Sequence, residues 1–176
     1  TITGDQSYFA KNPKYHMYLQ KDFPSYQDQI DARDRMLVKH PNLKFVGAHL
    51  GSLEWNINKL ANHFDEFPNV AVDMAARVPH LQFQSIDNRE KVRDFIIKYQ
   101  DRLIYSTDLS VESISNPDEL KKTMNDRWVS DWRFFVTDDE MKVSAFSTNL
   151  KGLKLPKAVI DKIYRGNAKK WFPSLI

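Results

Sequence analysis

The segment Leu43-Lys-Phe-Val-Gly-Ala-His49 decides the fold, because it is a short, mainly apolar run that ends in a histidine. Two similar runs follow it, Asn69-Val-Ala-Val-Asp-Met-Ala75 and Arg102-Leu-Ile-Tyr-Ser-Thr-Asp108. Runs of this length, separated by segments with helical periodicity, are typical of buried parallel strands. We therefore predict an α/β fold in which the three runs form a parallel sheet with right-handed crossovers.

Capping residues and apolar spacing predict helices between and around these strands. Ser25 and Asp28 form a capping-box pair, Asp87 and Glu90 a second one, and Asn116 is a third N-cap. The predicted helices cover residues 25–39, 53–64, 87–99, 117–135 and 156–171. The segments 1–23 and 75–86 are expected to be irregular, and 137–155 is ambiguous, with a short β excursion at 142–146. We expect one domain over residues 1–176.

Composition excludes several classes of protein. The chain of 176 residues can form one core, but a complete eight-stranded α/β barrel typically needs about 250. The net charge of +3 is spread along the sequence, which does not favour nucleic-acid binding. No apolar run approaches the roughly 18 residues of a membrane span, and no signal peptide is recognised. We expect a soluble protein, cytoplasmic or periplasmic. With no cysteine, strong metal ligands are limited to His, Asp and Glu.

His49 and Asp108 stand where two predicted strands end, and the carboxyl ends of parallel strands are where α/β enzymes place their chemistry. The His49 imidazole has two candidate roles, as a metal ligand through a neutral nitrogen or as a group that polarises a substrate oxygen. Asp108 is a candidate catalytic base or metal ligand, since a carboxylate there carries a desolvation cost. The structural alternatives are a hydrogen-bonded histidine at a strand end and a carboxylate that caps the next element.

Three further residues near these strand ends are candidates for substrate binding. Asp73 lies within its strand, Arg77 just beyond it, and Trp55 soon after His49. The Arg77 guanidinium is suited to hold a substrate carboxylate through two parallel hydrogen bonds. Alternatively, Asp73 and Arg77 form a structural ion pair. The other four histidines lack metal-ligand spacing and are interpreted as surface or packing residues.

Four segments of the chain carry a family resemblance when taken in order. They are His40-Pro-Asn-Leu-Lys-Phe-Val-Gly-Ala-His-Leu-Gly51, residues 69–75, residues 102–108 and Ile163-Tyr-Arg-Gly-Asn-Ala-Lys-Lys-Trp-Phe172. Together they resemble the amidohydrolase-related family of metal-dependent hydrolases, in the branch with aminocarboxymuconate-semialdehyde decarboxylase-like enzymes. The resemblance implies a partial (β/α)8 TIM-type barrel, strands 6 to 8 with flanking helices. It places His49 at the end of strand 6 and Asp108 at the end of strand 8.

The same resemblance implies a divalent metal, zinc in the complete enzyme, with His49 and Asp108 among its ligands. The family's His-x-His pair of strand 1 and its strand 5 histidine have no counterpart here. Three situations therefore stay open: the chain is a piece of a longer enzyme, a partner supplies the missing half of the barrel, or no metal is bound. Three parallel strands also leave two exposed edges, so we expect a homo-oligomer or association with that missing half.

The function that the resemblance implies is metal-dependent hydrolysis, in which water attacks a C–N or C–O bond of a small-molecule substrate. Metal-dependent, non-oxidative decarboxylation of a carboxylated substrate is an alternative, and released CO2 would distinguish it. A non-catalytic α/β assembly module is another, with the aromatic N-terminal segment and Trp128 and Trp132 as its interface. The isolated chain is expected to be an incomplete, inactive piece with little or no metal.

Overall fold

A small parallel sheet forms the centre of the protein in a computed structural model, which describes residues 9–109, 116–143 and 146–175. Its strands lie in the order β1 (Phe45–Gly47), β2 (Val70–Asp73) and β3 (Leu103–Ile104). All pairs are parallel, as the sequence predicts, and the register aligns β1 with β2 and β2 with β3. The α/β class is thus confirmed. In the described residues this sheet has three strands and does not close into a barrel.

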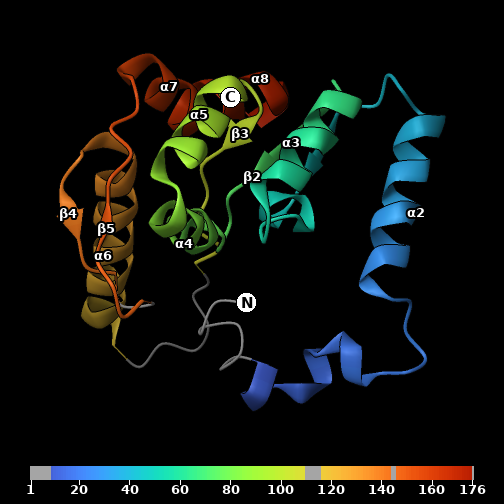
Figure 1. Cartoon of the computed structure of the whole chain (residues 1–176), viewed down its shortest axis with the longest axis horizontal. Coiled ribbons are helices and arrows are strands. Elements are labelled where there is room, and N and C mark those ends of the chain that lie inside the picture. Colours follow the sequence, from blue (N-terminus) through green and yellow to red (C-terminus); the bar gives the residue numbers. More distant parts are fainter. Residues whose placement is uncertain (1–8, 110–115, 144–145, 176) are drawn as a thin grey trace.

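Helices connect these strands and pack around the sheet (Figure 1). The α-helices that lie wholly within the described residues are α2 (Tyr26–Lys39), α3 (Ile57–Glu66), α4 (Val78–Asp87), α5 (Arg89–Lys98), α6 (Pro117–Val136), α7 (Lys157–Asp161) and α8 (Asn167–Trp171), and residues 9–11 are helical as well. A π-helical turn, Lys162–Gly166, joins α7 to α8. Short 3-10 turns cover Pro13–Tyr15, Met17–Leu19, His49–Ser52 and Pro173–Leu175. No helix in these described ranges is long and apolar enough to cross a bilayer.

Two of the predicted helix starts are confirmed by their capping contacts. The Ser25 hydroxyl accepts a hydrogen bond from the Asp28 amide, and the Asp28 carboxylate accepts one from the Ser25 amide at 3.0 Å. The Asn116 side chain accepts from the amides that open α6. Local capping chemistry therefore fixes where α2 and α6 begin.

The prediction of an irregular segment over residues 75–86 is wrong from residue 78 onward, because α4 begins at Val78. Pro79 in the first helical turn is compatible with helix initiation, and Val78 and Leu81 are buried. As a result, Asp87 ends α4 instead of capping the next helix. The side chain of Asn88 caps α5 by accepting from the Lys91 amide at 3.0 Å.

The C-terminal part differs from the prediction in detail. Strands β4 (Glu140–Met141) and β5 (Leu150–Lys151) form an antiparallel hairpin, whereas the β excursion was predicted at 142–146. Residues 144–145 of that range lie outside the described residues. Pro156 is the N-cap of α7 and not its first helical residue, and the predicted last helix is interrupted by the π-helical turn.

The apolar core lies between the sheet and the helices of the C-terminal two thirds of the chain. Its largest fully buried side chains include Phe64, Phe134, Phe135 and Ile163. Helix α2, by contrast, buries only Leu37. The core therefore supports β2 and β3 more extensively than it supports α2.

Candidate functional site

The chain leaves β1 through a left-handed turn, His49–Ser52, whose φ angles are 56°, 55°, 64° and 59°. Each non-glycine residue in this conformation costs about 1–2 kcal/mol, and only Gly51 avoids that cost. Ala76 after β2 (φ 53°) and Asp108 after β3 (φ 57°) are left-handed as well. Such backbone strain persists where surrounding contacts hold it, and it clusters at functional sites. All three carboxyl ends of the sheet therefore carry the signature of a constrained site.

Hydrogen bonds from the end of β2 orient His49. The Asp73 Oδ1 atom accepts from the His49 amide at 2.9 Å and from the Ala75 amide at 3.0 Å. The His49 Nδ1 atom lies 2.8 Å from the Ala75 carbonyl oxygen. Because a carbonyl oxygen can only accept, this contact assigns the proton to Nδ1 and leaves the lone pair on Nε2. The half-buried imidazole is thus set to accept a hydrogen bond or to bind a metal through Nε2.

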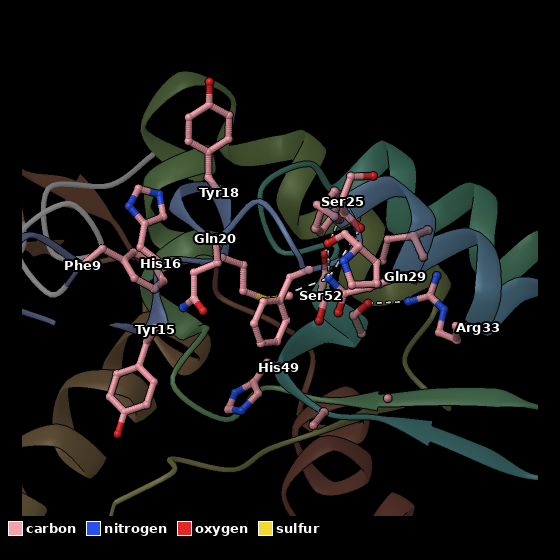
Figure 2. A pocket seen from close by; sticks show the side chains of 18 of the residues that line it. Phe9, Tyr15, His16, Tyr18, Gln20, Ser25, Gln29, Arg33, His49 and Ser52 are labelled. Carbon is pink, nitrogen blue, oxygen red and sulfur yellow. Dashed lines mark hydrogen bonds between the residues drawn. The ribbon is translucent and has the colours of Figure 1, made fainter. Parts of the chain in front are cut away.

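A cavity of about 750 Å³ lies beside β1, with His49 in its wall. Figure 2 shows the His49 ring between Tyr15 and His16 on one side and Ser52 and Arg33 on the other. The described lining is rich in aromatic and aliphatic side chains and contains no carboxylate. Its size falls in the range of small-molecule sites. The aromatic N-terminal segment, expected to be irregular, contributes much of this wall.

Two side chains of helix α2 bind the carbonyl groups of the left-handed turn. The Arg33 guanidinium donates to the Gly51 carbonyl, and the Tyr26 hydroxyl donates to the Ser52 carbonyl. Burial raises the pKa of Tyr26, which keeps this hydroxyl protonated as a donor. The Trp55 indole in turn donates to the Tyr26 oxygen at 3.0 Å. Trp55, predicted to bind substrate, is 53% exposed and does not line the cavity that contains His49.

Arg77 pairs with Glu54 and not with Asp73, which was the ion-pair partner considered from the sequence. The Arg77 Nε atom lies 3.1 Å from Glu54 Oε1, and both side chains are largely buried. The second carboxylate oxygen of Glu54 is buried and has no hydrogen-bond partner among the described residues. The guanidinium is therefore held near the end of β2, next to a carboxylate that is only half satisfied.

Asp108 lies at the same carboxyl-terminal end of the sheet as His49, but two strands away. Neighbouring strands are about 4.8 Å apart, so roughly 10 Å separates the two strand ends. The Asp108 side chain is exposed and is not part of the wall of the His49 cavity. The structure thus brings the two residues to the carboxyl-terminal end of the sheet, at a separation that a substrate could bridge.

Two side chains at the carboxyl ends of the strands are candidate ligands for the divalent metal that the family resemblance implies. His49 Nε2 suits a divalent ion, and Asp108 offers a carboxylate. Catalytic zinc sites use three protein ligands, and the residues with defined positions contain no group of three or more His, Cys, Asp or Glu arranged to hold an ion. These residues alone therefore do not fit a catalytic metal centre.

The contacts of Arg33 and Tyr26 with the turn were not predicted from the sequence. Both residues lie on a helix at least 18 residues before the carbonyls they reach, and only tertiary structure brings them together. One signal was available, since Gly51 directly follows the apolar run and glycine favours left-handed turns.

Comparison with protein families decides the assignment. The model of the family described as Amidohydrolase matches residues 16–174, which includes all three parallel strands and every candidate site residue. The chain belongs to the amidohydrolase family. This confirms the resemblance inferred from four sequence segments and supports a general amidohydrolase-type enzymatic function. No curated protein and no solved structure matches the chain significantly.

Proposed function

We propose that this amidohydrolase-family chain provides the His49 side of an active site that hydrolyses a C–N or C–O bond of a small molecule. The observation that carries the proposal is the 2.8 Å contact between His49 Nδ1 and the Ala75 carbonyl, at the wall of a cavity of ligand size. It leaves His49 Nε2 as an acceptor. Family membership supports the reaction class.

In this mechanism His49 Nε2 accepts a proton from the attacking water as a general base. A neutral imidazole with a hydrogen bond at Nδ1 is suited to that role, since the bond stabilises the imidazolium that forms. With Nδ1 protonated, neutral His49 has no donor at Nε2, so polarising a substrate oxygen is the less favoured of its two original roles.

Asp108 and Arg77 complete the proposed site from the ends of β3 and β2. Asp108 is proposed as a second proton acceptor or as a metal ligand, and Arg77 as a binding group for a substrate carboxylate. His49 and Asp108 are the residues of this chain that a divalent metal such as zinc would use. Because the described donor set is incomplete, no step is assigned to that metal.

The missing part of the site is proposed to come from the rest of an eight-stranded barrel, supplied upstream in the same protein or by a partner chain. The outer edge of β1 has no neighbouring strand among the described residues, and it borders the cavity. An open parallel edge of this kind is normally covered or paired. Association along β1 would also enclose His49.

The test is product analysis on the protein in the form that its source cell makes. We expect amide or ester substrates to release amine or alcohol, and His49→Gln to lower kcat/KM by about 10²–10⁴-fold, the usual contribution of a general base. His40→Gln is the matched control, because His40 is exposed at the end of α2 and is remote from the turn. Release of CO2 instead would favour the decarboxylase alternative. Full activity in His49→Gln would disprove the assignment of His49.

A further inference from the structure

Asp73 was considered from the sequence as a substrate-binding residue, but in the structure its carboxylate binds backbone amides. It is the last residue of β2, and one of its oxygens accepts backbone amides from two different strand ends, those of His49 and Ala75. A carboxylate that accepts two N–H groups is a strong anchor, since both bonds are charge-assisted. The side chain therefore ties the end of β1 to the end of β2.

The contacts around Asp73 close a ring. Asp73 holds the amide of His49, the His49 imidazole donates to the Ala75 carbonyl, and the Ala75 amide returns to Asp73. Both the backbone and the ring of His49 thus depend on the same carboxylate. Loss of either hydrogen bond to Asp73 would therefore shift the imidazole relative to the Ala75 carbonyl oxygen.

The strained left-handed turn needs hydrogen bonds at both of its ends, and the ring of contacts supplies those at its start. All three L-residues of the turn besides Gly51 adopt positive φ, so the turn relaxes unless contacts hold both of its ends. Arg33 and Tyr26 bind its last two carbonyls from α2. Asp73 binds its first amide, which belongs to the residue that carries the imidazole.

We propose that Asp73 is a positioning residue for His49: it holds the first amide of the left-handed turn and thereby fixes the imidazole with its proton on Nδ1 and its lone pair on Nε2. The inference rests on the proposed function for its catalytic meaning. Its structural content, the tautomer and the held amide, is measurable without any substrate.

The experiment is NMR of the whole chain with ¹⁵N-labelled histidine, comparing Asp73→Asn and Asp73→Ala with the wild type. The side-chain amide oxygen introduced by Asp73→Asn can accept the same two N–H groups, so this variant is expected to keep the Nδ1-protonated tautomer. Asp73→Ala is expected to give a mixture of tautomers and to speed hydrogen exchange of the His49 amide by about tenfold or more, the loss of one hydrogen bond. Asp94→Asn, an exposed carboxylate on α5, is the matched control and leaves both signals unchanged.

The wild-type chain provides a test that does not depend on variant folding. Protection of the His49 amide from exchange, together with a scalar coupling across its hydrogen bond to the Asp73 carboxylate, is expected. A fast-exchanging His49 amide overturns the proposal. An unchanged tautomer in a folded Asp73→Ala, or a tautomer lost equally in Asp73→Asn, overturns it as well.

Activity separates this inference from the proposed function. If Asp73→Ala shifts the tautomer and His49→Gln is fully active, the positioning contact stands and the general-base function fails. If Asp73→Ala keeps the tautomer but loses activity, Asp73 acts on the substrate directly and the positioning role is wrong. Joint loss of tautomer and activity, with both retained in Asp73→Asn, supports both.

Discussion

The two edges of the parallel sheet are built differently, although β1 and β3 are strands of the same kind. At β3 the C-terminal segment seals the edge: the Tyr105 amide donates to the Ile163 carbonyl, and Asn167 donates to the carbonyls of Gln100 and Leu103 at 2.6 and 2.7 Å. At β1 the chain forms a strained turn beside a cavity of about 750 Å³. Figure 1 shows α2, which flanks this side, at the edge of the molecule.

This difference indicates that the β3 edge contributes mainly to stability and the β1 edge to the candidate site. Buried, mutually satisfied groups hold the β3 edge, while the turn at β1 is held by partly exposed polar side chains of α2. Functional segments are commonly drawn from the less stable parts of a protein. We therefore expect substitutions at the β3 edge to affect global stability, and substitutions at the β1 edge to affect local order of the turn.

The largest effect is expected for Asn167→Leu, which keeps the branched side-chain shape but removes both N–H donors. Asn167 is 2% exposed, so the carbonyls of Gln100 and Leu103 would lose partners in a region that water does not reach easily. We expect a loss of about 2–4 kcal/mol in the free energy of unfolding, measured by urea denaturation. Asn149→Ala, at an exposed site with a 3.2 Å bond to Glu140, is the control and should change little. A loss below about 0.5 kcal/mol in Asn167→Leu would break the comparison.

The second effect concerns Asp131, which is buried behind β3. The Tyr105 hydroxyl donates to it at 3.1 Å, and burial raises the pKa of Asp131 to about 6 although Arg127 opposes this. The unfolded carboxyl titrates near 4, so between pH 4 and 6 the native state keeps a proton that the unfolded state releases. Stability therefore falls as the pH rises through this window, by up to about 3 kcal/mol. Asp131→Asn should remove this loss. The free energy of unfolding of the variant, relative to that of the wild type, should therefore increase from pH 4 to pH 7.

His63 of α3, next to Arg33, gives the free energy of unfolding the opposite pH dependence. Because the two contributions oppose each other in the wild type, each one has to be measured with its own variant. Burial, reinforced by Arg33, lowers the pKa of His63 to about 4, and Arg33 Nη2 lies 3.4 Å from His63 Nδ1. Here the unfolded state binds the extra proton, so stability rises with pH between about 4 and 6.5. His63→Gln should flatten that rise, while Asp131→Asn flattens the fall. The measurement is the free energy of unfolding by urea denaturation at pH 4 and pH 7. If each variant differs from the wild type by the same amount at both pH values, the predicted pH dependences are wrong.

The sequence predicted the parallel strands and the capped helices well, because local signals determine both. Three apolar runs, the Ser25 and Asp28 pair and the Asn116 cap all act within a few residues. The missed helix α4 had such a signal as well, since Pro79 in its first turn was not used. In this part of the chain, more careful reading of local chemistry would have sufficed.

The geometry of the candidate site could not be predicted, because non-local contacts and one irregularity of the sheet determine it. Met74 donates to Ile104, as a regular ladder requires, but Ala76 donates to Thr107 where the same register would use Ser106. One extra residue is therefore taken up after β3, which changes the direction of the following side chains. Strict alternation along the run could not give the direction of Asp108.

The smallest effect is expected for Tyr26→Phe, which tests the α2 side of the turn. The change removes the hydroxyl that donates to the Ser52 carbonyl and accepts from the Trp55 indole. Both partners are exposed, so water replaces much of the lost bonding, and we expect about 0.5–1.5 kcal/mol in unfolding free energy. Tyr18→Phe, at a ring that is 89% exposed, is the control and should be neutral.

The local measurement for Tyr26→Phe decides more than its global stability does. The amides of Gly51 and Leu53, which donate within the turn to Ala48 and Leu50, should exchange faster in Tyr26→Phe while the amides of the β3 edge stay unchanged. That pattern would show that the turn opens independently of the sealed edge. Equal acceleration at both edges, or a global loss as large as that of Asn167→Leu, would instead mean that the sheet unfolds as one unit, and the strained turn would then share the stability of the core.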